Sequence, residues 1–224
     1  MDFSFYINPF KNRGTIIELQ FALDDPGGLA AESTKAFEMR SRQLDADEKL
    51  DVIKWYLSKC RFVDAEKLAS QVVSETDGMK PEAVFVLGMA QLCRGDYQAS
   101  ATTMQKAGKL GIRRAAYMHV YISTHVLERA DKEMEDTVRE AIKSGEINES
   151  GTVAYAALGF CSVATNGLAS FQMFVENKTK KMDQLFLTRP GIGEVYLFLC
   201  RKHGNKEEYE RVGKLLGSTT GTVR

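Results

Sequence analysis

The sequence predicts a mainly α-helical protein, an α-α superhelix of about five helical hairpins with a short N-terminal β-hairpin or extended arm. Two observations predict this class. From Leu29 onward the chain has a helical pattern almost throughout, whereas residues 1–28 alternate apolar and more polar side chains. In addition, turn-forming residues recur along the helical part at nearly constant intervals. We therefore expect an arm at 1–28, a helical repeat domain at 29–216 and a flexible tail at 217–224.

The N-terminal arm has the period of two that is expected for half-buried strands. Phe3, Phe5 and Ile7 alternate with more polar residues, and the apolar residues of 17–23 follow the same pattern. A hairpin loop is expected at 8–14, and the turn-forming stretch 24–28 ends the arm. Because a lone two-stranded hairpin is marginal in water, the arm is expected to pack on the helical body or on another chain.

Five positions have the composition of a turn between two helices, and 34 to 38 residues separate each from the next. They are Cys60, Gly95, Arg129, Asn166 and Gly204. A period in this range is typical of helical repeat arrays, in which each helix pair buries its apolar face against its neighbour. The uncharged stretch 150–175 is long enough to cross a bilayer, but the turn signal Asn166-Gly167 divides it. We expect two short helices there, forming a buried or interface hairpin, and no membrane span.

Residues 81–114 carry the most specific pattern in the chain. Large and small residues stand where two antiparallel helices pack at a tight turn, and Gly95-Asp96-Tyr97 forms the turn. The packing positions are Val84, Leu87, Gly88, Ser100, Met104 and Ala107. This segment resembles a tetratricopeptide (TPR) repeat, and the resemblance extends more loosely over about 44–216. Gln91 and Ile112 depart from the family pattern, which usually has an aromatic residue and a proline there.

The resemblance implies a concave groove lined by the first helix of each pair. The positions expected to contact a partner are Phe85, Met89, Leu92, His119, Ser123, Val126, Phe160 and Val163. This surface is largely apolar and has no Lys/Asn/Arg clamp for a C-terminal carboxylate, so the implied ligand is a hydrophobic or amphipathic protein segment. The alternative is that these side chains belong to the core, because apolar residues at helical spacing are commonly core residues.

Composition disfavours several other classes of function. Thirty basic residues balance thirty acidic ones, so no general field attracts nucleic acid or an anionic membrane. The four cysteines are widely spread and form no C-x-x-C pair, which argues against a disulfide framework and a zinc site. We find no catalytic constellation, cofactor motif or metal-ligand set, and we expect neither enzymatic activity nor a bound cofactor. The N-terminus lacks the pattern of a secretory signal, so a cytoplasmic location is expected.

Three further groups of polar residues have conventional interpretations. His119 and His125 are six residues apart, so they are expected on different faces of one helix, at surface or groove positions. His203, beside Gly204, is expected at a helix C-terminus. The basic clusters Arg113-Arg114 and Lys178-Thr179-Lys180-Lys181 are expected at helix ends where cations complement the dipole, with docking of an acidic partner as the alternative. We expect Glu207, Glu208 and Glu210 to form ordinary surface ion pairs with nearby cations of the same helix.

Two functions follow as hypotheses. The first is a protein-interaction module, an adaptor or chaperone, similar in architecture to the TPR-type chaperones of bacterial type III secretion. The second is a structural or regulatory subunit that assembles through the N-terminal arm and the uncharged hairpin 150–175, with homo-oligomerisation as one form of this assembly.

Overall fold

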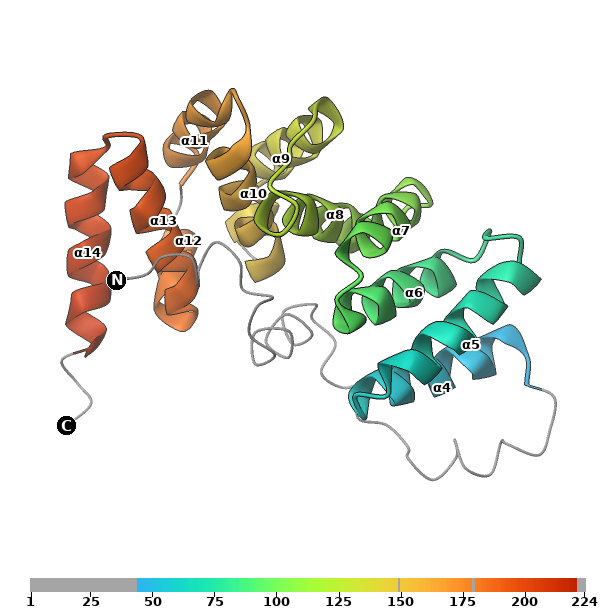
Figure 1. Cartoon of the computed structure of the whole chain (residues 1–224). Coiled ribbons are helices and arrows are strands. Elements are labelled where there is room, and N and C mark those ends of the chain that lie inside the picture. Colours follow the sequence, from blue (N-terminus) through green and yellow to red (C-terminus); the bar gives the residue numbers. More distant parts are fainter. Residues whose placement is uncertain (1–43, 149, 179, 221–224) are drawn as a thin grey trace. The chain divides into compact units, whose positions relative to one another are not determined.

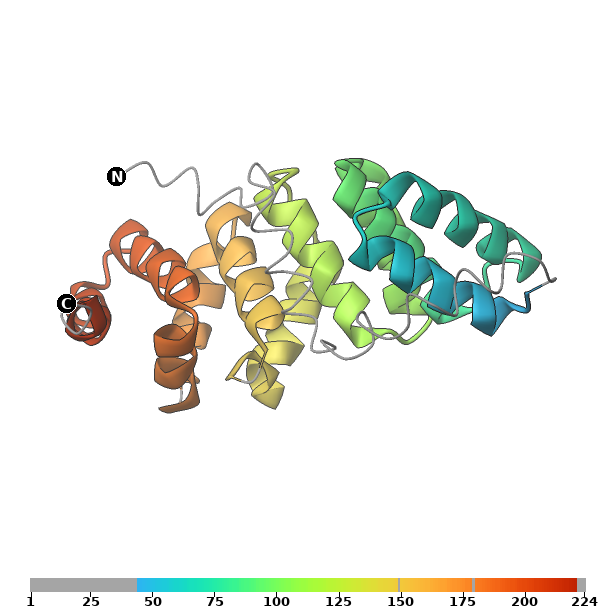
Figure 2. The same cartoon turned by 90° about the horizontal axis from the view of Figure 1, so that it is seen from below.

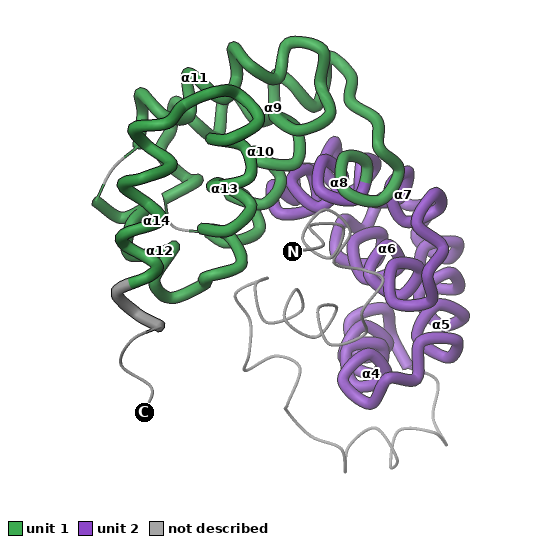
Figure 3. Tube along the Cα trace, turned by 60° about the vertical axis from the view of Figure 1, so that its left-hand side comes forward, with its two compact units in different colours: residues 1–12, 123–224 green, residues 13–122 purple. Residues whose placement is uncertain are grey.

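The structure is a computed structural model that describes residues 44–148, 150–178 and 180–220. These residues form α-helices and one short 3-10 helix, with no strand among them, which confirms the prediction of a mainly α-helical protein. The chain divides into two compact units, whose described parts are residues 44–122 and 123–220 (Figure 3). The arm predicted at 1–28 lies outside the described residues.

The unit at 44–122 consists of four helices that pack in the order of the sequence, followed by part of a fifth. These are α4 (Ala46–Ser58), α5 (Phe62–Glu75), α6 (Pro81–Arg94), α7 (Tyr97–Lys109) and the first part of α8 (Arg113–His125). Helices α4 and α5 lie side by side in Figures 1 and 2, and α6 packs on α4, α5 and α7. Helix α4 begins with a capping box. The Asp45 side chain accepts a hydrogen bond from the backbone N–H of Glu48, and the Glu48 side chain accepts one from the backbone N–H of Asp45.

The close contact between α6 and α7 depends on the small residues at their crossing. A Cβ atom added at Gly88 would lie 3.1–3.2 Å from three side-chain atoms of Met104, so only glycine lets the two helices meet at this separation without a shift. The Ser100 hydroxyl donates a hydrogen bond of 2.7 Å to the Gly88 carbonyl in the same buried contact. The turn residue Gly95 has φ 85°, a left-handed conformation that glycine adopts without strain. The packing roles predicted for Gly88, Ser100 and Met104 are confirmed.

The unit at 123–220 is built around α10, which packs against three other helices. Its elements after α8 are α9 (Lys132–Ser144), the 3-10 helix η3 (Glu146–Asn148), α10 (Gly151–Val163), α11 (Gly167–Glu176), α12 (Lys180–Thr188), α13 (Pro190–Lys202) and α14 (Lys206–Thr220). Helix α10 contacts α9, α11 and α13, whereas α12 packs on α13 and α14. Ten of the thirteen residues of α10 are buried, in keeping with its central place.

Each of the five predicted turn positions lies between two successive helices. The segment 150–175 forms α10 and α11, separated near Asn166 as expected. Helix α12 is an additional element between α11 and α13 that the expected hairpins did not include. The helical domain also extends further than predicted, because α14 continues to Thr220 instead of ending at 216. TPR geometry itself stays a prediction.

Candidate functional site

The predicted binding residues of the unit at 44–122 are buried. Phe85 and Met89 are each 5% exposed and Leu92 is 1% exposed, all on α6. The guanidinium carbon of Arg114 lies 4.4 Å from the centroid of the Phe85 ring, so a cation covers one face of this aromatic side chain. His119 on α8 is also buried, and its Nδ1 lies 2.9 Å from the carbonyl oxygen of Ala101 on α7.

The remaining predicted binding residues lie in the unit at 123–220. Ser123 and Phe160 are buried, whereas Val126 and Val163 are half-buried. Six of the eight predicted residues therefore occupy buried positions in the structure. This arrangement agrees with the alternative that they belong to the core, and it leaves Val126 and Val163 as the members with appreciable exposure. Their role in binding a partner stays a prediction.

The expectation of surface histidines is wrong for the described chain. His125 is buried, and its Nε2 lies 3.0 Å from the carbonyl oxygen of Tyr155 on α10. A Cβ atom at Gly159 would overlap the His125 ring, so the glycine provides the space that this histidine occupies. The spacing of His119 and His125 correctly indicated that they lie on different faces of α8. It did not indicate that other helices cover both of these faces, α7 at His119 and α10 at His125.

His203 is the C-cap residue of α13, as predicted. Its ring stacks on Phe171 of α11 at a centroid distance of 5.0 Å. Burial lowers the pKa of His203, and the neighbouring Lys202 acts in the same direction, while the hydrogen bond to the Cys161 carbonyl oxygen opposes them. The neutral imidazole is therefore the form that this contact favours.

The buried cysteines are packing residues. Cys161 and Cys200 are inaccessible, and burial raises the pKa of each thiol to about 12. Because the thiolate is the nucleophilic form, neither side chain has the environment of a catalytic cysteine. Cys60, by contrast, is exposed in the turn after α4, where it adopts a left-handed φ of 57°.

Lys178 follows the C-terminus of α11 as expected, but the other four cations of the two basic clusters lie at helix N-termini. Arg113 and Arg114 open α8, and Lys180 and Lys181 open α12. The first turn of α8 contains no acidic residue. Cations at a helix N-terminus oppose the macrodipole instead of complementing it, so the expected dipole role is wrong for these four residues.

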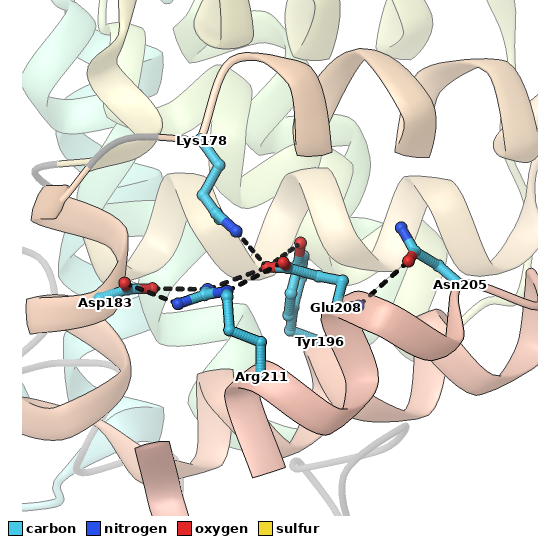
Figure 4. Close-up of polar contacts among 6 residues, drawn as sticks. All are labelled: Lys178, Asp183, Tyr196, Asn205, Glu208 and Arg211. Atoms are coloured by element: carbon cyan, nitrogen blue, oxygen red, sulfur yellow. Dashed lines mark hydrogen bonds and ion pairs between the residues drawn. The ribbon is translucent and has the colours of Figure 1, made fainter. Parts of the chain in front are cut away.

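The most concentrated group of charges is one that sequence reasoning assigned to the surface. Glu208 is only 7% exposed, so the expectation of ordinary surface pairing is wrong for this residue. Its carboxylate accepts hydrogen bonds from Arg211 at 2.9 Å, from the Tyr196 hydroxyl at 3.0 Å and from Lys178 (Figure 4). Arg211 also donates two bonds of 2.8 Å to Asp183, which gives a bidentate pair.

The network determines the charge states of its members. Burial by itself raises the pKa of Glu208, but hydrogen bonds from Arg211, Lys178 and Tyr196 outweigh it and bring the pKa to about 2. Burial also raises the pKa of the Tyr196 phenol, so the hydroxyl stays a proton donor to Glu208. A buried, fully ionised carboxylate thus joins α13, α14, α12 and the segment before α12.

Local sequence carried only part of the signal for this network. Arg211 follows Glu208 by three residues, a spacing that is equally typical of exposed helix pairs. Asp183 and Lys178 lie 28 and 30 residues from their partners, and their proximity depends on where α12 packs. The polar groups converge among apolar rings, since Tyr196 contacts Phe171, Phe174 and Phe186. The network is a candidate for a structural role in positioning helices.

The chain matches no protein-family model, no curated protein and no solved structure. Within residues 44–148, 150–178 and 180–220, no three His, Cys, Asp or Glu side chains gather in a way that would hold a metal ion. The helices of this described part include none that is both long and apolar enough to span a membrane.

Proposed function

We propose that this protein is a non-enzymatic interaction module, an adaptor or chaperone that holds a hydrophobic or amphipathic segment of a partner protein. The observation that supports the proposal best is the contact between Phe85 and Arg114. Helix α6 is apolar around most of its circumference, and the exposed Arg114 covers the Phe85 ring. Helix pairs that pack in sequence order are the architecture in which helical repeat proteins present extended binding surfaces.

The Arg114 side chain is a cover that can be displaced. It is exposed at the start of α8 and makes no ion pair with a described residue. A cation–π contact at an exposed site contributes only about 0.5–1 kcal/mol, so rotating the guanidinium away from Phe85 costs little. An apolar side chain of a partner then gains contact with the uncovered Phe85 ring.

The same geometry indicates the chemistry of the partner segment. A displaced guanidinium at a helix N-terminus is best satisfied by a carboxylate, because Arg forms bidentate pairs with carboxylates and the helix dipole favours an anion there. We therefore infer a partner segment in which an acidic residue accompanies one or two large apolar side chains. This refines the hydrophobic or amphipathic segment that the resemblance implied, and it uses an exposed arginine and not only buried groove residues.

The test is affinity purification of the full chain from its native cell, comparing wild type with Arg114→Glu and Lys67→Glu. Lys67 is an exposed cation on α5 and provides the matched charge reversal away from Phe85. We expect a partner recovered with wild type and Lys67→Glu to be lost with Arg114→Glu, while the melting temperatures of all three remain the same. Recovery of the same partner with Arg114→Glu would show that the proposed surface does not bind it.

A second candidate is a structural or regulatory subunit that assembles through the uncharged hairpin 150–175 together with the N-terminal arm. The observation that favours it is the exposure of Leu168, which is 48% exposed at the start of α11 in a stretch without charges. Depletion of charge is typical of the centre of protein interfaces. Light scattering would test this candidate, since Leu168→Lys or deletion of residues 1–28 is expected to reduce the mass of an oligomer, whereas Arg114→Glu is not.

A further inference from the structure

Helix α12 combines a buried apolar face with features that make the isolated helix weak. Met182, Leu185 and Phe186 are buried, and α12 contacts α13, α14 and η3. With 9 residues, however, it is shorter than the length at which isolated helices become stable in water. Lys180 and Lys181 at its start oppose the helix dipole, and Asp183 in its first turn complements the dipole. Its helical state therefore depends on its contacts with neighbouring helices.

The junction between α12 and α13 has the form of a hinge. Arg189 is the single residue between the two helices, with φ −135° and ψ 76°, and Pro190 opens α13. A residue before proline is restricted to extended conformations, so the two helices cannot merge into one. Helix α12 ends with its own local bonds, because the Thr188 hydroxyl donates to the Gln184 carbonyl at 3.0 Å. A change in backbone conformation at Arg189 alone moves α12 relative to α13.

Ion pairs fasten both the helix and the segment that leads into it. Asp183 of α12 accepts the bidentate bonds of Arg211 on α14, and Lys178 before α12 pairs with Glu208, also on α14. The two attachments differ in exposure. The side chains of Arg211 and Asp183 are 36% and 30% exposed, whereas those of Lys178 and Glu208 are 18% and 9% exposed. The outer pair is therefore accessible to salt, and the inner pair is largely shielded from it.

We propose that α12 is a strap that detaches from α13 and α14 as a unit, and that two ion pairs determine how often it opens: its own Asp183–Arg211 pair and the Lys178–Glu208 pair just before it. The strap is Lys180–Thr188. In the closed form Phe186 packs on the Tyr196 ring at a centroid distance of 5.0 Å, and a Cβ atom at Gly193 would lie 3.3 Å from the Phe186 Cβ and closer still to Leu216 of α14. Opening uncovers this apolar face of α13, so the strap controls access to it.

Hydrogen exchange of the full chain, resolved to individual peptides by mass spectrometry, tests the proposal. The variants are Asp183→Asn, Glu208→Gln and the matched control Glu207→Gln, which changes an exposed neighbour on α14. Because hydrogen bonds to charged groups are strong, we expect the α12 amides to exchange about 10-fold faster in Asp183→Asn. The amides of α10 and α13 are expected to remain within about twofold of wild type, which is within the effect of a surface substitution.

Salt provides a second measurement on the unaltered chain. At about 1 M salt the screening length falls to about 3 Å, which weakens the partly exposed Asp183–Arg211 pair. We expect α12 exchange to accelerate in wild type and much less in Asp183→Asn, which already lacks this charge pair.

Two outcomes would overturn the proposal. Equal acceleration in α12, α13 and α14 of Asp183→Asn would show that these helices open only together, so that α12 is no separate strap. Unchanged α12 exchange in both Asp183→Asn and Glu208→Gln would show that the ion pairs do not fasten it. Since Asp183→Asn alters a partly exposed residue, it keeps the test informative if Glu208→Gln fails to fold.

Discussion

Replacing Glu208 by glutamine (Glu208→Gln) tests whether the buried charge network stabilises the unit at 123–220. Glutamine preserves the size of the side chain and removes its charge. In the folded chain it leaves Lys178 and Arg211 without the carboxylate that they share, and it leaves the Tyr196 hydroxyl with a weaker acceptor. We expect a loss of about 3 kcal/mol in the free energy of unfolding, at the lower end of the range for breaking a buried ion pair.

Two related considerations give this magnitude. Hydrogen bonds to charged groups contribute roughly 1.5–3 kcal/mol each, but Arg211 keeps its pair with Asp183 and is partly exposed, so only part of its contribution is lost. Separately, the pKa of Glu208 is about 2, against an ordinary value of 4.5. That difference corresponds to about 3 kcal/mol of stability at neutral pH. Both considerations rest on the same hydrogen bonds to the Glu208 carboxylate, and the unfolding measurement tests whether that carboxylate is stabilising.

The pH dependence has a definite sign. Because folding lowers the pKa of Glu208, its contribution is complete above pH 4.5 and is lost as the pH falls towards 2. Urea unfolding followed by far-UV circular dichroism at pH 7 and pH 3 measures this, with Glu207→Gln as the exposed control. The difference between wild type and Glu208→Gln is expected to shrink at pH 3. A difference below about 0.5 kcal/mol at pH 7, the usual effect of a surface substitution, would refute the reasoning.

Three further predictions concern other contacts of the described residues. Gly159→Ala is expected to cost about 1–3 kcal/mol in urea unfolding because the new methyl group overlaps the side chains of His125 and Thr124. The cost of Gly159→Ala should be smaller when it is measured in a chain that already carries His125→Ala. No loss in Gly159→Ala would contradict the packing. Because folding lowers the pKa of His203, its contribution to stability is present above pH 6.5 and is lost as the pH falls below that value. The melting temperature should therefore depend less on pH in this range in His203→Gln than in wild type. An unchanged dependence would contradict this prediction. Cys60 is expected to react with a thiol reagent in the native chain, whereas Cys161 and Cys200 are expected to react only after unfolding. Mass spectrometry of alkylated peptides measures this, and labelling of Cys161 or Cys200 in the native chain would contradict the prediction.

The helical architecture was predictable because its signals are local. Gly95 and Gly204 adopt left-handed conformations at helix ends, and small residues such as Gly88 allow close helix contact, so both features are readable along a single stretch of sequence. The turn at Cys60 was found from the recurring interval, since cysteine is an unusual residue for its positive φ. Helix α12 was not singled out, because nine residues carry little periodicity.

The candidate sites were less predictable because they depend on which faces are covered. Apolar residues at helical spacing have the same pattern in a groove as in a core, and so Phe85, Met89 and Phe160 could not be assigned to either from spacing alone. The Glu208 network could not be predicted for a different reason. The Glu208–Arg211 pair has the spacing of an exposed helix pair. The other two charged partners, Lys178 and Asp183, lie about 30 residues away in the sequence, and their proximity depends on helix packing that the sequence pattern does not reveal.

The central proposal, that the protein holds an apolar and acidic segment of a partner at the Phe85–Arg114 surface, is tested most directly by site-specific crosslinking in the native cell. A photo-crosslinking residue would replace Arg114 in one chain and Lys67 in another. We predict that the residue at position 114 forms adducts with one partner, at a segment that contains large apolar side chains beside an Asp or Glu. Position 67 should give no such adduct. Equal labelling from both positions, or no partner adduct at 114 when the partner still copurifies, would contradict the proposal.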